Sequence, residues 1–279
     1  MPALIPDNIS DRDFQFISDL VHDHCGINLH GGKKELVQAR LTRCLRQSGC
    51  STVAEYLAQV RDDSTGGELA GLTDAISTNL TSFFREASHF DHLRAKFLPV
   101  LLENKRTTGS RRIRAWSAGC STGEEPYSIA ITLLEALGRD AGWDAKLLAT
   151  DISRPVLEQA TRGAYEPQRL SAMPAILRDR YFRETRCAAK PTYQAAELLR
   201  QMIRFNHLNL MADWPFKGAF DFIFCRNVMI YFDKPTQQKL VNRFWQCLAP
   251  GGLLFTGHSE SLTGVSHKFR YVLPTIYAR

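Results

Sequence analysis

This sequence of 279 residues lacks several features that would place it in particular classes of protein. No apolar run is long enough to cross a bilayer, and Pro2, Pro6, Asp7 and Asp11 interrupt the first residues, so we expect neither direct membrane insertion nor a signal peptide. The seven cysteines contain no Cys-x-x-Cys pair, which indicates a reduced, cytoplasmic protein. Low-complexity tracts are absent too, and 44% hydrophobic residues are enough for packed cores.

Acidic residues are fewer than basic ones. The sequence has 35 lysines and arginines and 29 aspartates and glutamates, which gives a net charge of +6. This surplus favours an acidic partner without choosing among nucleic acid, a membrane surface and an acidic protein. The excess of basic over acidic residues is most pronounced in a predicted helix over residues 33–48, where Glu35 is the only acid. The basic residues of that helix lie mostly away from its apolar stripe. They are either an ordinary solvated face or a docking site for an acidic partner: Lys33, Arg40, Arg43 and Arg46.

Residues 113–127 read as a strand, a glycine turn and the start of a helix, the first unit of a doubly wound α/β sheet. The apolar run ends in Gly119 and Gly123, where the backbone can approach a ligand and helix-start amides face the crevice. Glu124 and Glu125 follow, and two carboxylates at this lip would suit a ligand with a positive charge better than a pyrophosphate. The spacing is not Gly-x-Gly-x-x-Gly, so the glycines could also form no more than a turn.

An acid ends the next predicted strand. Residues 145–151 form a buried apolar run that finishes in Asp151, at about the usual spacing beyond a glycine turn for a carboxylate that binds both ribose hydroxyls. A ribose together with a cationic group indicates S-adenosylmethionine rather than NAD. Asp151 and the acidic residues after the turn together favour a cofactor role for Gly119 over a simple turn.

The first part of the chain is helical by its apolar periodicity. Helices are predicted over residues 10–25, 33–48, 52–60, 68–77 and 87–104, and a basic linker over 105–112. An all-α N-terminal domain should therefore end between residues 85 and 110. His22, His24 and Cys25 are close in sequence, but His24 falls on a different helical face, so we expect no metal site.

The stretch from Thr78 to Glu86 fits neither helical nor strand periodicity. Polar Asn79, Thr81 and Arg85 alternate there with apolar residues. These polar side chains could cap a core and satisfy buried backbone groups. They could equally present an amide, a hydroxyl and a guanidinium to a ligand.

In the second half, Ser153 is predicted to cap a helix over 154–162, and residues 164–205 look like an insertion with short antiparallel strands at 181–182, 191–193 and 202–205. A central strand over 219–225 ends in Arg226 and Asn227, and ligands of open α/β sheets bind just past such strand ends. A helix over 235–248, a strand from Gly252 and a closing hairpin over 269–278 complete the chain. The Pro-Gly-Gly before that last strand and the hairpin fit a methyltransferase better than an NAD domain.

Four blocks of this sequence resemble the CheR-type methyltransferases, which esterify glutamates of chemoreceptors. They are Thr78-Asn-Leu-Thr-Ser-Phe-Phe-Arg-Glu, Trp116-Ser-Ala-Gly-Cys-Ser-Thr-Gly-Glu-Glu-Pro-Tyr-Ser, Phe224-Cys-Arg-Asn-Val-Met-Ile-Tyr-Phe-Asp and Pro250-Gly-Gly-Leu-Leu-Phe-Thr-Gly-His-Ser-Glu. The resemblance implies an α/β fold: a class I (Rossmann-like) S-adenosylmethionine-dependent methyltransferase domain with an all-α N-terminal domain and a small inserted antiparallel β subdomain. We place the all-α domain at 1–85, a linking helix and linker at 86–112, and the methyltransferase domain at 113–279 with its insertion at about 164–205.

The resemblance also implies site residues and partners. Tyr231 would lie beside the transferred methyl group, and the expected partner is the cytoplasmic helical bundle of a chemoreceptor. Some members bind a receptor's C-terminal tether peptide at the inserted subdomain, where this chain has residues 187–192, and we expect a monomer. The cofactor contacts implied are Asn79, Thr81, Arg85, Glu124, Asp151, Asn209, Leu210 and Asn227; to them the strand-end position adds Arg226.

A glutamate carboxylate, with a pKa of about 4.3, is already a nucleophile at neutral pH, so its methylation needs no general base. This agrees with the absence of a Ser-His-Asp or Cys-His constellation. Catalysis would depend on alignment and desolvation, with Tyr231 and Arg85 as candidate catalytic residues. The alternatives are a nucleic-acid methyltransferase, or a binding module that keeps the fold and is catalytically silent. The first usually needs an Asn/Asp-Pro-Pro-aromatic pocket, and Asn227-Val-Met-Ile-Tyr has no proline.

Overall fold

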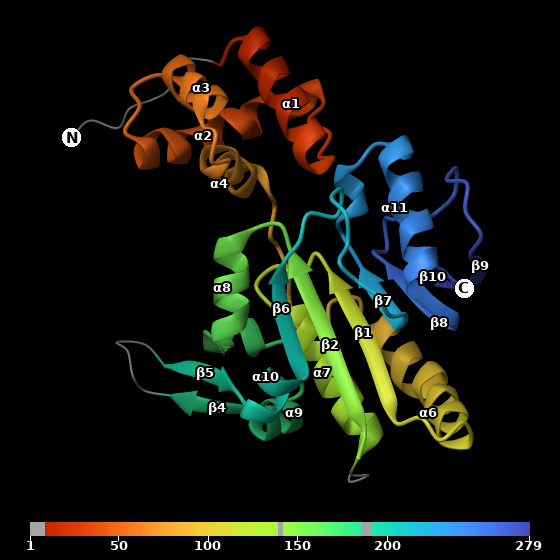
Figure 1. The fold of residues 1–279 in the computed structure, drawn as a ribbon. Helices are drawn as coiled ribbons and strands as arrows, with labels where there is room; N and C mark the ends of the chain where they lie inside the picture. Colours follow the sequence, from red (N-terminus) through yellow and green to blue (C-terminus); the bar gives the residue numbers. More distant parts are fainter. Residues whose placement is uncertain (1–8, 139–141, 186–190) are drawn as a thin grey trace. The chain divides into compact units, whose positions relative to one another are not determined.

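The computed structural model describes residues 9–138, 142–185 and 191–279. Its chain contacts divide it into two compact units (Figure 1). The first consists of Met1–Thr78 together with the short segment Tyr231–Thr236, and the second of Asn79–Ile230 and Gln237–Arg279. The units therefore divide at Thr78 and Asn79, whereas the sequence placed the domain boundary at residue 85. Within the described residues, no helix combines the length and apolar character that crossing a membrane requires.

The first unit is helical, as predicted. Its helices are α1 (Asp11–Cys25), α2 (Lys34–Ser48), α3 (Val53–Asp62) and α4 (Gly67–Ile76), with a short 3-10 turn, η1 (Gly31–Lys33), before α2. The Ser10 side chain accepts the amide of Asp13 at the start of α1, and Thr52 and Glu55 form the predicted capping box of α3. Each helix buries one apolar face, and Val37, Leu41 and Leu45 are that face of α2.

Arg40 of α2 has a role that helical periodicity did not reveal. Its guanidinium lies at the carboxyl end of α4, where it donates hydrogen bonds to the carbonyls of Ala75 (3.1 Å), Ile76 and Ser77 and to Thr78 Oγ1 (3.0 Å). The last carbonyls of a helix have no partner within the helix, so a cation there satisfies them and complements the helix dipole. Arg40 is thus used inside the first unit, whereas Arg43 and Arg46 are exposed.

Replacing Arg40 by alanine should lower the free energy of unfolding by about 1–3 kcal/mol, because the helix end would lose charge-assisted hydrogen bonds. Urea denaturation followed by circular dichroism measures this. Arg43→Ala on the same helix is the matched control and should change stability by no more than about 0.5 kcal/mol. Equal stability of the two variants would show that Arg40 contributes nothing as a cap.

The second unit is built on a seven-stranded sheet in the order β6-β2-β1-β7-β8-β10-β9 (Figure 1). The pairs from β6 to β8 are parallel, and β10 runs antiparallel to both β8 and β9. All six residues of β7 are buried, as expected for a parallel strand covered on both faces. The strands are β1 (Arg112–Ala118), β2 (Asp144–Asp151), β6 (Ile203–His207), β7 (Phe220–Cys225), β8 (Leu248–Thr256), β9 (Arg270–Leu273) and β10 (Ile276–Ala278).

The helices of this unit follow the predicted pattern with one interruption. The principal ones after the first strand are α7 (Glu124–Leu137), α8 (Arg154–Arg162) and α11 (Lys234–Cys247). The single helix predicted over 87–104 is α5 (Ala87–His92), a π-helical stretch η2 (Leu93–Phe97) and α6 (Leu98–Thr107). Because α6 continues to Thr107, the predicted linker over 105–112 is partly helix. Ser153 is the N-cap residue of α8, as predicted, but its side chain makes no capping hydrogen bond.

The inserted subdomain is a small antiparallel sheet in the order β3-β5-β4, with β3 (Ala164–Tyr165), β4 (Phe182–Thr185) and β5 (Thr192–Ala195). The short helices α9 (Ala175–Tyr181) and α10 (Glu197–Met202) and the 3-10 turn η3 (Pro167–Leu170) accompany it. The prediction of a third inserted strand at 202–205 is wrong. Ile203–His207 instead pair in parallel with Leu147–Asp151 of β2, because the chain has returned there to the edge of the main sheet. Of the predicted tether loop, residues 187–190 lie outside the described residues.

Candidate active site

The glycine turn after β1 is formed as predicted. Gly119 and Gly123 have φ angles of 86° and 99°, in the left-handed region that favours glycine, and α7 begins at Glu124. Close packing is a second reason why each of these positions requires glycine. A Cβ on Gly119 would lie 2.3 Å from Val228 Cγ2, and one on Gly123 would lie 2.6 Å from the Tyr165 hydroxyl. The turn therefore packs closely against the loop after β7 and against the inserted subdomain.

Asp151 lies at the carboxyl end of β2, beside this turn. Its Oδ2 accepts the amide of Ser121 (2.8 Å) and its Oδ1 accepts the amide of Ser153 (3.0 Å), so it also fixes the shape of the turn. An ionised carboxylate offers about four acceptor sites and can bind several donors at once, so a carboxylate at this strand end is chemically suited to ribose hydroxyls. The backbone carbonyl of Asp151 accepts the amide of Leu208 (3.0 Å) and thereby holds the start of the loop that carries Asn209 and Leu210.

The two glutamates after the turn do not form the open acidic lip that the sequence suggested. Glu124 is fully buried; its Oε1 lies 2.6 Å from Arg169 Nη1 of the inserted subdomain, and its Oε2 accepts a hydrogen bond from Thr122 (2.6 Å). Glu125 turns the other way. It accepts the Ser117 hydroxyl (2.7 Å) and pairs with Arg226 (3.3 Å). Burial raises the pKa of Glu125, and the Arg226 charge opposes that shift.

The stretch from Asn79 to Glu86 belongs to the second unit and contacts the glycine turn. The Ser121 hydroxyl donates to the Asn79 carbonyl (2.8 Å), and the Phe84 amide donates to Ser128 Oγ of α7 (2.9 Å). Phe83 is in the core, while Asn79, Thr81 and Arg85 are partly exposed, so a contact of these three side chains with a ligand stays a prediction. The Arg85 guanidinium donates to the Leu80 carbonyl (2.8 Å).

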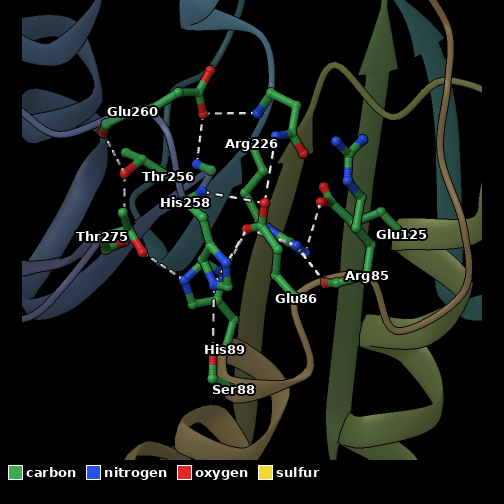
Figure 2. A network of polar contacts seen from close by, with 12 residues as sticks. Arg85, Glu86, Ser88, His89, Glu125, Arg226, Thr256, His258, Glu260 and Thr275 are labelled. Carbon is green, nitrogen blue, oxygen red and sulfur yellow. Dashed lines mark hydrogen bonds and ion pairs between the residues drawn. The ribbon is translucent and has the colours of Figure 1, made fainter.

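Arg226 is the centre of a buried charge network that Figure 2 shows. Its guanidinium pairs with Glu86 (3.0 Å) and Glu125 (3.3 Å), donates to the Arg85 carbonyl, and lies over the rings of Phe90 and Phe224. Burial alone would raise the pKa of Glu86, but the Arg226 charge and the hydrogen bonds to the carboxylate hold it below its ordinary value. The structure thus directs Arg226, expected at the cofactor, into an internal network that supports Arg85 and Asn227.

Glu86, His89 and His258 form a cluster whose ligand atoms lie within 4.8 Å of one another. His89 is buried, and its Nε2 lies 2.8 Å from Thr275 Oγ1. Burial and the nearby Arg226 charge lower the pKa of His89 to about 4, so the ring is neutral at pH 7. The guanidinium of Arg226, 3.0 Å from Glu86 Oε2, would repel a metal cation at that oxygen. We therefore assign the cluster to the charge network and not to a metal.

Asn227 follows directly after Arg226, at the carboxyl end of β7. Its φ of 59° is in the left-handed region, which asparagine tolerates better than most residues. Its side-chain amide donates to Glu86 Oε1 (3.4 Å), and its backbone amide donates to Glu260 Oε2 (2.7 Å). In the loop after β6, Leu210 is buried, and its carbonyl accepts a hydrogen bond from Arg243 (2.6 Å).

Tyr231 lies in the first unit, in the short segment Tyr231–Thr236. Its carbonyl accepts the Asn28 amide (2.7 Å), and Phe232 forms an antiparallel bridge with Ile27. The ammonium of Lys33 lies 5.5 Å from the centre of the Tyr231 ring. Lys33, expected on a docking surface, is therefore partly buried against Tyr231.

The second unit gathers most of the predicted cofactor residues at one end of its parallel sheet: the ends of β1, β2 and β7 and the loop after β6. Sequence reasoning gave no role to six residues in and around this edge, although four of the six stand in the blocks that carry the family resemblance. They are Glu86, His89, Ser121, Arg169, His258 and Glu260. A sheet of this order with a glycine turn after β1, an acid after β2 and an antiparallel closing hairpin defines a class I S-adenosylmethionine-dependent methyltransferase.

Comparisons with known proteins agree with this class and identify one family within it. Residues 79–278 match the family described as CheR methyltransferase, SAM binding domain, and residues 12–77 match CheR methyltransferase, all-alpha domain. A probable chemotaxis protein methyltransferase of Rhizobium etli is 42% identical over 259 residues, which cover 92% of this chain and 96% of the relative. Chemotaxis protein methyltransferase 2 of Pseudomonas aeruginosa is 44% identical over 272 residues, 96% of this chain and 92% of the relative. The chain belongs to the CheR methyltransferase family.

Proposed function

We propose that the chain transfers a methyl group from S-adenosylmethionine to glutamate side chains of methyl-accepting chemoreceptors and produces glutamate methyl esters. The observation that carries this proposal is the sheet edge where Asp151, the glycine turn and Asn227 meet, in a chain that matches the CheR family over nearly its whole length. The carboxylate of Asp151, at the end of β2 beside the glycine turn, would accept the ribose hydroxyls of the cofactor.

S-adenosylmethionine supplies an electrophilic methyl group on a sulfonium, and the protein residues have to bind and orient the two reactants. Asp151 would hold the ribose. Asn79, Thr81, Arg85, Glu124, Asn209, Leu210 and Asn227 would complete the cofactor site, and Tyr231 would position the methyl group or the acceptor. The acceptor carboxylate is ionised at neutral pH, so no residue has to remove a proton from it. Rate enhancement then comes from alignment and from the exclusion of water.

The proposed protein substrate is the helical bundle of a chemoreceptor, whose methylation sites lie among glutamates. Of the four basic residues predicted to dock it, Arg43 and Arg46 are exposed on α2. They can contact an acidic rod, whereas Arg40 caps α4 and Lys33 lies against Tyr231. Exposed charges contribute little each and are screened by salt, so this surface should act through recognition and steering.

Replacing Arg43 and Arg46 together by alanine should slow receptor methylation by about three- to tenfold at low ionic strength and much less at high salt. Initial rates with receptor membranes at two salt concentrations measure this. Affinity for S-adenosylhomocysteine, measured by calorimetry, should stay unchanged. If the double variant methylates receptors at the parent's rate in low-salt buffer, Arg43 and Arg46 do not take part in docking and form an ordinary solvated face.

Two finer proposals concern assembly. In the inserted sheet, β4 is an edge strand, so an extended receptor tether peptide could pair with its free side. We also propose that the chain acts as a monomer, because the exposed large hydrophobic side chains of the described residues are scattered over several elements, Val100 on α6 and Ile176 on α9 among them, with only Tyr271 and Leu273 together on β9. Calorimetric titration of tether peptides and light scattering test the two proposals.

The substrate is tested by offering labelled S-adenosylmethionine with receptor membranes, with a soluble receptor signalling domain and with nucleic acid. Label should enter the receptor fractions alone and should be lost when the acceptor glutamates are replaced by alanine. Label in nucleic acid would indicate a nucleic-acid methyltransferase. Cofactor binding without transfer to any acceptor would indicate a catalytically silent module.

A further inference from the structure

Two loops leave neighbouring strands of the sheet on the side of the proposed site. The loop after β7 carries Asn227 and leads through Ile230 to Tyr231, and the loop after β8 carries Gly257, His258 and Glu260. Glu260 of the second loop is 5% exposed, and its carboxylate points toward the first loop (Figure 2). The site as proposed so far gives this buried carboxylate no role.

The Glu260 carboxylate is surrounded by backbone amides. Its Oε2 accepts the amides of Asn227 (2.7 Å) and Gly257 (2.5 Å), and its Oε1 accepts the amide of Ile230 (3.1 Å). Converging backbone N–H groups of this kind form an anion-binding nest, here filled by a side chain of the same chain. Burial raises the pKa of Glu260, and the backbone amides oppose that shift.

Two further contacts show how closely the loops are held together. A Cβ at Gly257 would lie 2.7 Å from both Asn227 Nδ2 and Glu260 Oε2, so only glycine allows this approach. A second carboxylate bridges the same loops, because Glu86 Oε1 accepts the His258 amide (3.2 Å) and the Asn227 side-chain amide (3.4 Å). The left-handed backbone of Asn227 is less favourable than an extended one even for asparagine, and these contacts help to hold it.

We infer that Glu260 is a positioning residue, whose carboxylate holds the loop after β7 so that Asn227 is placed for methyl transfer. This inference rests on the proposed function of the site. Glu260 acts through the loop and touches neither reactant. Removing its charge would leave the Asn227, Gly257 and Ile230 amides without their acceptor and let the loop move.

Glu260→Gln tests this with a side chain of the same size that sets an NH2 group against the amide donors. The turnover number should fall about 100-fold, the loss that misplacing reacting groups by about 1 Å can produce. Affinity for S-adenosylhomocysteine should fall about tenfold as Asn227 shifts. The KM for receptor should stay near the parent's value, because the proposed docking residues Arg43 and Arg46 lie on α2 and not in this loop. The matched control is Glu103→Gln, which changes an exposed glutamate of α6 and should leave all three values unchanged.

Glu260→Ala adds a rescue experiment, because it leaves the nest empty. Formate should fill it and restore part of the turnover number, whereas neutral formamide should not. If Glu260→Ala does not fold, Glu260→Gln decides alone. The inference is overturned if folded Glu260→Gln keeps the parent's turnover number and cofactor affinity and has lost only stability. Calorimetry of S-adenosylhomocysteine binding needs no methyl acceptor. It therefore still tests whether Glu260 positions Asn227 if the parent protein does not methylate receptors and the proposed function fails.

Discussion

Asp151→Ala should lower the affinity for S-adenosylhomocysteine by about 2–3 kcal/mol, roughly 30- to 150-fold. Two losses combine in this expectation. The ribose would lose a charged acceptor in a largely buried position, and the Ser121 and Ser153 amides would lose the carboxylate that shapes the turn. Isothermal calorimetry with the purified parent and variant measures the difference.

Asp151→Asn is the matched comparison, because it keeps the size and one carbonyl oxygen but loses the charge. Its affinity should lie between those of the parent and the alanine variant. An alanine variant that is folded and binds S-adenosylhomocysteine as tightly as the parent would remove Asp151 from the cofactor site.

Arg226→Ala should lower the free energy of unfolding by about 3–5 kcal/mol at pH 7.5, because it leaves Glu86 and Glu125 buried without their cation. The loss should depend on pH. Without Arg226 the native pKa of Glu125, already raised by burial, would rise further, so the native state would hold more protons than the unfolded chain. The stability of the variant should therefore fall as pH rises above the unfolded value of about 4.3.

Urea unfolding at pH 5 and pH 7.5 measures this dependence, and the gap between variant and parent should be smaller at pH 5. Arg94→Ala is the control, because Arg94 forms an exposed pair with Asp91 and its removal should change stability by no more than about 0.5 kcal/mol at either pH. A gap at pH 7.5 no larger than that of the control would mean that Arg226 does not neutralise the buried glutamates.

The parts of the site that sequence could predict are those whose signals are local. The glycine turn shows in the residues that end β1, and the position of Asp151 shows in one apolar run that ends in an acid. The capping box of α3 lies within four residues. The remaining site residues were predicted from the family resemblance. That resemblance depends on four short sequence blocks that occur in the same order along the chain.

The parts that sequence could not predict depend on pairs distant in the chain. Arg226 and Asn227 are both polar residues after a strand, and nothing local says that the first turns inward to Glu86, which is 140 residues earlier. Helical periodicity placed Arg40 on a basic face, but a long side chain can reach the end of another helix. Strand Ile203–His207 looked like part of the insertion because its partner, β2, lies more than fifty residues earlier.

The chemistry of the product tests the central claim most directly. Receptor membranes labelled with methyl-tritiated S-adenosylmethionine and this protein are washed and treated with mild alkali, and the volatile label is counted. Glutamate methyl esters release methanol under these conditions, so nearly all the protein-bound label should become volatile. Label that stays on the protein after alkali would show methylation of nitrogen and would contradict the assignment of this protein as a glutamate O-methyltransferase.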